Sequence, residues 1–182
     1  MTKILITEFI DSQSLQNINK KFDVIYKKDA WQNKDFLEKE IQKFDGIIVR
    51  NKTSLDKKIL INASNLKFIG RLGVGLDNID TEYCKKNNII VQPATGMNSD
   101  SVAEYVLNSS LTLLKKTQII NELTLQGKWP RTSIVTKELT GKILGLIGFG
   151  DISKKVLKLV NVFDGTCIAY DPFITFKEME VD

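Results

Sequence analysis

The chain has 182 residues, of which 42% are hydrophobic and 26% charged, a composition typical of a globular protein with one domain or two small ones. Its net charge of +4 comes from 26 basic and 22 acidic residues of interspersed sign, so we expect a solvated surface and no nucleic-acid partner. The apolar runs are well below the roughly 20 residues of a membrane helix, and the first residues turn polar too soon for a signal peptide. We therefore expect a cytoplasmic protein without a membrane partner, whose cysteines, Cys84 and Cys167, are free thiols.

The first part of the chain, residues 1–97, alternates strand and helix patterns. The predicted strands are residues 4–6, 24–26, 46–49, 66–69 and 89–91, and the helical segments between them are residues 12–20, 35–43, 55–62 and 81–86. Asp80 is expected to cap the last of these helices. Strands that alternate with helices are joined by right-handed crossovers and form a parallel sheet. The sequence thus predicts an α/β domain with a flavodoxin-like, doubly wound sheet of five parallel strands.

The second part begins with a long helix that starts at Ser99 or Asp100 and carries an apolar stripe. It is expected to run, with or without a break, to Gln126, because Gly127 is a natural helix stop. Residues 128–139 are predicted to form an ordered loop, in which Trp129 is a packed aromatic side chain. A strand–helix–strand pattern follows, with strands at residues 143–147 and 166–170.

A glycine turn with the sequence GFG lies between the first of these strands and the helix. Such a turn needs one glycine, here Gly148, for the sharp bend and a second, Gly150, so that phosphates can approach the backbone at the helix N-terminus. Ser153 replaces the third glycine of G-x-G-x-x-G and is expected to loosen the packing slightly. Asp171, about 20 residues beyond the turn, can accept hydrogen bonds from ribose hydroxyls and repel a 2′-phosphate, which favours NAD over NADP. The alternative is an ordinary tight turn in which Asp171 caps the strand end.

Four motifs occur in order along the chain: RLGVGLDNID at residues 71–80, NSDSVAE at 98–104, GKW at 127–129 and GKILGLIGFG at 141–150. In this order they resemble the D-isomer-specific 2-hydroxyacid dehydrogenase family, and the resemblance covers nearly the whole chain. Within that family, IIVRNKT at 47–53 and the arginine of GRLG at 70–73 are similar to the D-3-phosphoglycerate dehydrogenases in particular.

The resemblance implies a substrate domain at residues 1–97 and, at 98–182, a connecting helix followed by the first part of a Rossmann NAD-binding domain. It implies that backbone N–H groups hold the substrate carboxylate and the cofactor pyrophosphate, and that two arginines contact a substrate phosphate. The implied residues are Val74 and Gly75 for the carboxylate, Val74 also for the nicotinamide, Arg50 and Arg71 for the phosphate, Gly148, Gly150, Asp151 and Ile152 for the pyrophosphate, and Asp171 for the ribose. The helix that starts near Ser99 would form a homodimer interface. Without the resemblance, Arg50 and Arg71 also fit solvated surface arginines.

The family's catalytic arginine, glutamate and histidine are expected beyond residue 182, because the chain contains no histidine and ends shortly after Asp171. We therefore expect no catalytic residue and no metal site within this chain. For the complete enzyme the resemblance implies NAD-dependent oxidation of D-3-phosphoglycerate to 3-phosphohydroxypyruvate, in serine biosynthesis. The alternatives are another 2-hydroxy acid, such as glyoxylate, glycerate or lactate, and a truncated, non-catalytic module that binds NAD or dimerises.

Overall fold

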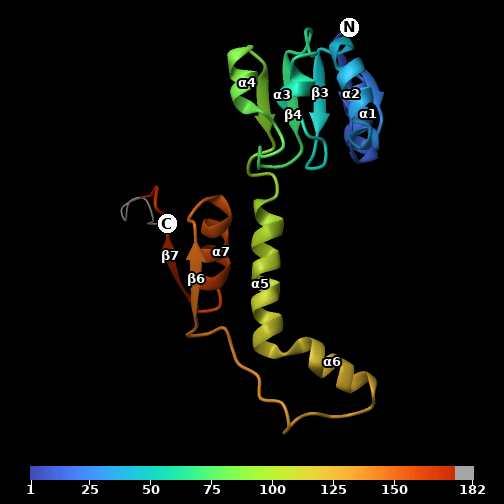
Figure 1. The fold of residues 1–182 in the computed structure, drawn as a ribbon. Coiled ribbons are helices and arrows are strands. Elements are labelled where there is room, and N and C mark those ends of the chain that lie inside the picture. Colours follow the sequence, from blue (N-terminus) through green and yellow to red (C-terminus); the bar gives the residue numbers. More distant parts are fainter. Residues whose placement is uncertain (175–182) are drawn as a thin grey trace. The chain divides into compact units, whose positions relative to one another are not determined.

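The computed structural model describes residues 1–174, which form two compact units (Figure 1). The first unit is Met1–Thr95, and the second unit begins at Gly96. Within residues 1–174 no helix is long and apolar enough to cross a membrane. Cys84 and Cys167 are free thiols, as predicted.

The first unit is built on a sheet of five parallel strands (Figure 1). The strand order is β2-β1-β3-β4-β5, which is that of the flavodoxin-like doubly wound fold, so the predicted fold class is confirmed. Its short strands are rich in isoleucine and valine, as expected where helices cover both faces of a sheet. They are β1 Lys3–Ile6, β2 Asp23–Tyr26, β3 Gly46–Val49, β4 Phe68–Arg71 and β5 Ile90–Pro93.

Two hydrophobic cores lie on opposite faces of this sheet, because successive strand residues point to opposite sides. One core joins Leu5, Ile47 and Ile69, all fully buried, to side chains of three helices, α2, α3 and α4. The other core joins Ile6 and Ile48 to side chains of α1. The helices are α1 Ser12–Asn19, α2 Lys34–Glu40, α3 Lys57–Leu60 and α4 Thr81–Lys86, with short 3-10 helices η1 Ala30–Gln32 and η2 Ile41–Lys43.

Side-chain caps explain where these helices begin. Each α-helix of the first unit follows an aspartate or asparagine whose side chain accepts a hydrogen bond from a first-turn N–H, a group that has no partner inside the helix. The predicted cap at Asp80 is confirmed by its bond to the Tyr83 N–H, at 2.9 Å. The other capping residues are Asp11, Asn33 and Asp56.

Strand β4 begins two residues later than the sequence predicted, and this shift places Arg71 inside the strand. Leu66 lies in a turn before the strand, where its N–H bonds to the Ala63 carbonyl oxygen and its buried side chain joins the core. The apolar pattern therefore began before the strand did. Within the sheet, Arg71 pairs with Val49 on one side and with Pro93 on the other.

The second unit begins with two helices, α5 Ser99–Lys115 and α6 Thr117–Leu125 (Figure 1). They are separated at Lys116, whose φ of 53° is left-handed, and Gly127, with a φ of 72°, follows the end of α6 as predicted. Trp129 is 82% exposed, so the expectation that it packs is wrong for the described chain. The surrounding loop is mostly exposed as well, and the Lys137 N–H ties only its far end to α5, through the Leu114 carbonyl oxygen.

A small parallel sheet completes the second unit. Its strands, β6 and β7, are joined by α7, in the strand–helix–strand pattern that the sequence predicted. One face packs against a small core of Ala103, Val156 and Val160, which come from α5 and α7. The opposite face is open in the described chain, with Ile147 95% exposed. The elements are β6 Ile143–Ile147, α7 Asp151–Asn161 and β7 Thr166–Tyr170.

Candidate functional site

The turn between β6 and α7 contains two glycines, and only one of them has a φ angle that requires glycine. Gly148 has a φ of 88°, which residues with a Cβ rarely adopt, so the bend itself needs glycine. Gly150 has an ordinary φ of −83°, and a Cβ built on it would meet no described atom within 4 Å. The fold alone therefore does not require glycine at position 150, whereas a phosphate that approaches the backbone there would.

Free backbone N–H groups surround this turn. In residues 1–174 no acceptor is paired with the N–H groups of Gly150, Asp151, Ile152 and Ser153, and α7 has no side-chain cap. The Lys154 N–H is bonded to the Gly150 carbonyl oxygen, at 3.0 Å. Free donors at the positive end of a helix dipole form a site suited to an anion such as a pyrophosphate.

Asp171, just after β7, is hydrogen-bonded to the same turn. Its Oδ2 accepts from the Phe149 N–H at 2.8 Å, and its Oδ1 accepts from the Phe173 N–H at 2.9 Å. These bonds, that from Phe149 above all, lower the pKa of Asp171 from its usual value near 3.8, so the group is a carboxylate at neutral pH. The predicted ribose ligand thus lies beside the glycine turn, and the same carboxylate also caps the end of β7.

Ser153 adds a hydrogen bond at the turn, whereas the expectation from the sequence concerned only its effect on packing, which stays a prediction. Its hydroxyl donates to the Gly148 carbonyl oxygen at 2.8 Å, which links the first turn of α7 to the loop before it. The expectation overlooked that a serine hydroxyl near a helix start can reach back to the backbone, a bond that glycine cannot make. The middle residue of the turn, Phe149, is buried and anchors it.

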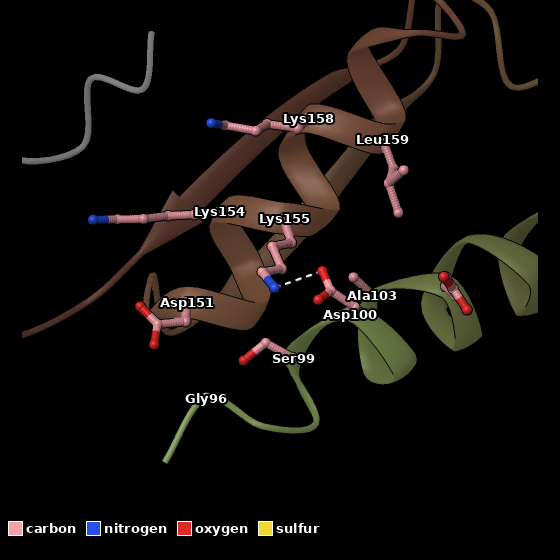
Figure 2. A pocket seen from close by; sticks show the side chains of 10 residues that line it. Gly96, Ser99, Asp100, Ala103, Asp151, Lys154, Lys155, Lys158 and Leu159 are labelled. Carbon is pink, nitrogen blue, oxygen red and sulfur yellow. Dashed lines mark hydrogen bonds and ion pairs between the residues drawn. The ribbon is translucent and has the colours of Figure 1, made fainter.

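A cavity of about 560 Å³ lies within the second unit, lined by the start of α5 and by α7 (Figure 2). In it, Lys155 Nζ lies 2.5 Å from Asp100 Oδ1, an ion pair that joins the two helices. Figure 2 shows Lys154 and Lys158 directed away from this pair. Asp151 forms no ion pair within residues 1–174, so a carboxylate without a partner stands next to the free N–H groups of the turn.

In the first unit, residues 73–75 form the predicted anion loop, directly after β4. The Gly73 N–H is occupied, since it bonds to the Arg71 carbonyl oxygen at 2.9 Å. The N–H groups of Val74 and Gly75 have no acceptor in the described part of the chain, and both residues are exposed. Two adjacent free donors remain for a carboxylate.

The Arg71 guanidinium lies against this loop. A Cβ on Gly73 would lie 1.5 Å from Arg71 Nη1, so with any other residue here the guanidinium would have to move away from the loop. Arg71 Nε is buried and has no hydrogen-bond partner in residues 1–174, which is unfavourable unless a further acceptor binds. Arg71 is therefore not a freely solvated arginine, and an anion that reached its guanidinium would satisfy Nε.

Arg50 directly follows β3 and is exposed, with its guanidinium 6.0 Å from the centre of the Phe9 ring. Two cavities of about 350 and 480 Å³ border it. The smaller one is also lined by Lys28, Lys52 and Trp31, and Lys52 Nζ lies 4.5 Å from the centre of the Trp31 ring. The same cavity is lined by Glu8 and Asp29, so the two lysines are balanced by two acidic residues and Arg50 supplies the excess positive charge.

Glu8, a residue that the sequence did not single out, organises the loop of residues 50–53. Its carboxylate is 4% exposed and accepts the N–H groups of Arg50 and Thr53 on Oε1 and of Lys52 on Oε2, at 2.8, 2.9 and 3.1 Å. Burial raises the pKa of Glu8, but the bonds from Thr53, Arg50 and Lys52 outweigh burial, and the pKa is lowered from the ordinary value of 4.5. The available signal was an acidic residue just after the first strand, at the sheet edge where ligands bind.

The structure brings the predicted residues together in two groups, one in each unit. Arg50, Arg71 and the 73–75 loop share the carboxyl edge of the first sheet. The glycine turn and Asp171 share the carboxyl edge of the second. Val74 and the glycine turn belong to different units, so a contact of Val74 with the nicotinamide stays a prediction.

Residues 4–178 match the family model described as D-isomer specific 2-hydroxyacid dehydrogenase, catalytic domain. The chain is 35% identical to (S)-sulfolactate dehydrogenase of Chromohalobacter salexigens, with 96% of this chain and 56% of that protein covered. It is 32% identical to D-3-phosphoglycerate dehydrogenase of Archaeoglobus fulgidus, with 98% and 34% covered. A solved structure of D-lactate dehydrogenase from Aquifex aeolicus, complexed with NAD and lactic acid, is similar with a TM-score of 0.82 and 26% identity, over 96% of this chain and 53% of that one.

The chain thus spans about half, or less, of the length of these relatives. The family model nevertheless extends over both units, from the first strand to beyond β7. The chain belongs to the D-isomer specific 2-hydroxyacid dehydrogenase family.

Proposed function

We propose that this chain supplies the substrate-binding domain and the first part of the cofactor-binding domain of an NAD-dependent dehydrogenase that oxidises D-3-phosphoglycerate to 3-phosphohydroxypyruvate. The observation that carries the proposal is the open glycine turn of the second unit, with its free N–H groups and the Asp171 carboxylate beside it. The relatives support the reaction class, since they are named as dehydrogenases of sulfolactate and phosphoglycerate, and the similar lactate dehydrogenase structure contains NAD.

When bound, NAD would accept the hydride from the carbon that bears the substrate hydroxyl. In this proposal the N–H groups of residues 150–153 hold the cofactor pyrophosphate, while Asp171 accepts hydrogen bonds from the ribose hydroxyls and repels a 2′-phosphate. The N–H groups of Val74 and Gly75 orient the substrate carboxylate. The proposal gives no residue of this chain the role of general acid or base.

Arg50 and Arg71, which lie at the carboxyl edge of the first sheet, support a substrate with an anion at each end. Arginine offers donors that match the oxygens of a phosphate, and the unpaired Arg71 Nε needs an acceptor, which a methyl group at the substrate's far end would not supply. A sulfonate also presents three oxygens. The similarity to a sulfolactate dehydrogenase therefore makes a sulfonated 2-hydroxy acid the second candidate.

Arginine substitutions in the complete protein test this proposal. Arg71→Ala should raise the KM for D-3-phosphoglycerate about 30-fold, which corresponds to about 2 kcal/mol of charged hydrogen bonding, and Arg50→Ala should raise it less because Arg50 is exposed. Activity on D-lactate should change little, since lactate has no second anion. The exposed Arg131 provides the control variant, Arg131→Ala.

Equal losses on lactate and phosphoglycerate would contradict the phosphate role and leave the substrate an unspecified 2-hydroxy acid. A larger Arg71→Ala effect on (S)-sulfolactate than on phosphoglycerate would favour the second candidate instead.

We also propose that α5 and α6 form a homodimer interface. The support is a set of apolar side chains on and after these helices that stay exposed, each of which would gain from burial against a partner. They are Tyr105, Leu113, Leu125 and Trp129, at 68, 78, 81 and 82% exposed. Leu113→Asp combined with Leu125→Asp should yield monomers in analytical ultracentrifugation, and a wild-type chain that is monomeric at every concentration would contradict the interface.

A further inference from the structure

The loop of residues 50–53 has its backbone polar groups bound from two sides. On one side the Glu8 carboxylate accepts the N–H groups of Arg50, Lys52 and Thr53. On the other side, Asn78 Nδ2 donates to the carbonyl oxygens of Arg50, at 2.8 Å, and of Thr53, at 2.7 Å. A loop with no regular secondary structure thus obtains its hydrogen bonds from two side chains, and these bonds restrict it to one conformation.

Buried hydroxyl groups reinforce the same loop. Thr53 Oγ1 lies 2.8 Å from Thr7 Oγ1, and the Thr7 hydroxyl also lies 3.3 Å from the Ile48 carbonyl oxygen. Thr7, Glu8 and Thr53 are three of the four buried polar residues in the described chain. Because polar groups are costly to bury, their concentration here indicates that the position of this loop is specified by hydrogen bonds and not by apolar packing alone.

Asn78 also belongs to the segment that carries the anion loop, four residues after Val74. Its carbonyl oxygen accepts the Leu55 N–H at 2.8 Å, and the Asp80 N–H donates to the Leu55 carbonyl oxygen at 3.0 Å. A parallel bridge between Leu55 and Ile79 lies at the same place. These bonds join the segment after β3 to the segment after β4, so a shift of one segment displaces the other.

The amide oxygen of Asn78 is buried and has no partner in residues 1–174. A buried acceptor without a partner is unfavourable, so the amide oxygen does not account for the presence of an asparagine at this position. What the amide contributes to the structure is its pair of N–H donors, both of which hold the 50–53 loop.

We propose that Asn78 and Glu8 are positioning residues that fix the distance between Arg50 and the donors of Val74 and Gly75, and thereby select the length of the anionic substrate. The inference rests on the proposed function, because it places the substrate carboxylate at Val74 and Gly75 and the far anion at Arg71 and Arg50. Of these two arginines, Arg50 lies on the loop that Glu8 and Asn78 hold. A substrate whose two anions are one carbon further apart fits poorly, since the two segments cannot separate without breaking the Asn78 bonds.

The test titrates the 182-residue chain with three ligands: D-glycerate, D-3-phosphoglycerate and 4-phospho-D-erythronate, whose phosphate is one carbon further from the carboxylate. Backbone amide NMR shifts at Arg50 and Gly75 give the dissociation constants. The wild-type chain should prefer D-3-phosphoglycerate to the longer ligand. Asn78→Ala should reduce that preference about tenfold, because a small displacement is enough to misalign an anion, while D-glycerate binding stays unchanged. A purely structural role would weaken all three ligands together.

Matched variants separate positioning from general damage. Asn87 also donates its amide to a backbone carbonyl oxygen, that of Tyr83 at 2.9 Å, but at the exposed end of α4, so Asn87→Ala is the control. Asn78→Ser has a hydroxyl that can donate one bond and should restore part of the preference. If Asn78→Ala does not fold, Glu8→Gln is titrated with the same ligands. The glutamine keeps an acceptor at the position of Oε1 but places an NH₂ group at that of Oε2, where it cannot accept the Lys52 N–H.

If Asn78→Ala and Glu8→Gln both kept the wild-type preference for D-3-phosphoglycerate over 4-phospho-D-erythronate, the inference would be overturned and the proposed function would stay in place. A wild-type chain that binds both phosphorylated ligands equally would overturn it too. A wild-type chain that binds none of the three ligands would overturn the proposed function together with the inference.

Discussion

The first unit has a hydrophobic core on each face of its sheet, whereas residues 96–174 of the second unit form one small core on a single face. In the first unit the loop of residues 50–53 follows β3, which is fully buried, and the buried side chains of Glu8 and Thr7 form hydrogen bonds to it. Within residues 96–174 the outer face of β6 and β7 is exposed, and the glycine turn is held by a bond from the Ser153 hydroxyl and a bond to the Asp171 carboxylate. The comparison indicates that the loop of residues 50–53 depends on the stability of the whole first unit, whereas the glycine turn depends on a few local bonds.

Removing core volume should give the largest difference between the units. Ile69→Ala, at a fully buried position, should lower the free energy of unfolding of the first unit by about 3–4 kcal/mol. Val160→Ala in the small core should cost the second unit only about 1–2 kcal/mol, because it removes less volume from a core that can relax. Native-state hydrogen exchange resolves the two units, and equal losses would show that both cores are packed equally well.

Glu8→Gln should lower the free energy of unfolding of the first unit by about 2 kcal/mol at neutral pH, because it weakens charged hydrogen bonds to three N–H groups. The folded-state pKa of Glu8 is lowered, so the carboxylate stabilises the fold above its unfolded value of 4.5, and this stabilisation is lost as the pH falls through the folded value. The stability curves of wild type and Glu8→Gln should therefore converge below about pH 4.5. A constant difference down to about pH 3 would contradict an origin in charge.

Asp171→Asn tests the local bonds of the second unit. The asparagine keeps an acceptor for the Phe149 N–H but loses the charge, so NAD binding should weaken about tenfold and the preference against NADP should narrow. The exposed Asp164 in the same unit supplies the control, Asp164→Asn. Isothermal titration calorimetry measures both cofactors, and equal wild-type affinity for NAD and NADP would speak against the ribose role.

The smallest effect concerns Asp151. This carboxylate has no ion-pair partner in residues 1–174 and lies next to the free N–H groups of the turn. Asp151→Asn should tighten NAD binding about two- to threefold at low salt, and the gain should disappear at high salt because exposed charges are screened. Unchanged affinity at low salt would show that the side chain is too far from the pyrophosphate to repel it.

The strand and helix order was predictable because short apolar runs alternate with polar, helix-period segments. The start of β4 was not, since Leu66 is as apolar as the strand but packs into the core from a turn. The burial of Trp129 was also misjudged, because a single aromatic in a polar loop contains no information on what covers it.

The parts of the candidate site that were predictable from the sequence are those in which the residue type reflects backbone geometry. Gly148 is an example, since residues with a Cβ rarely adopt its φ of 88°. Glu8 and Asn78 were not predictable, because they bind loop residues 42–45 and 25–28 positions away and no local pattern marks such partners. The Ser153 bond was missed although it spans five residues, because the motif treats that position only as a question of size.

The Ser153–Gly148 bond has a consequence for protein engineering. Consensus substitution, the replacement of an unusual residue by the common one, often stabilises proteins. Here Ser153→Gly would complete G-x-G-x-x-G, yet it would leave the Gly148 carbonyl oxygen without its hydroxyl partner and place a flexible residue in the first turn of α7. In this chain the departure from the consensus is itself the stabilising choice.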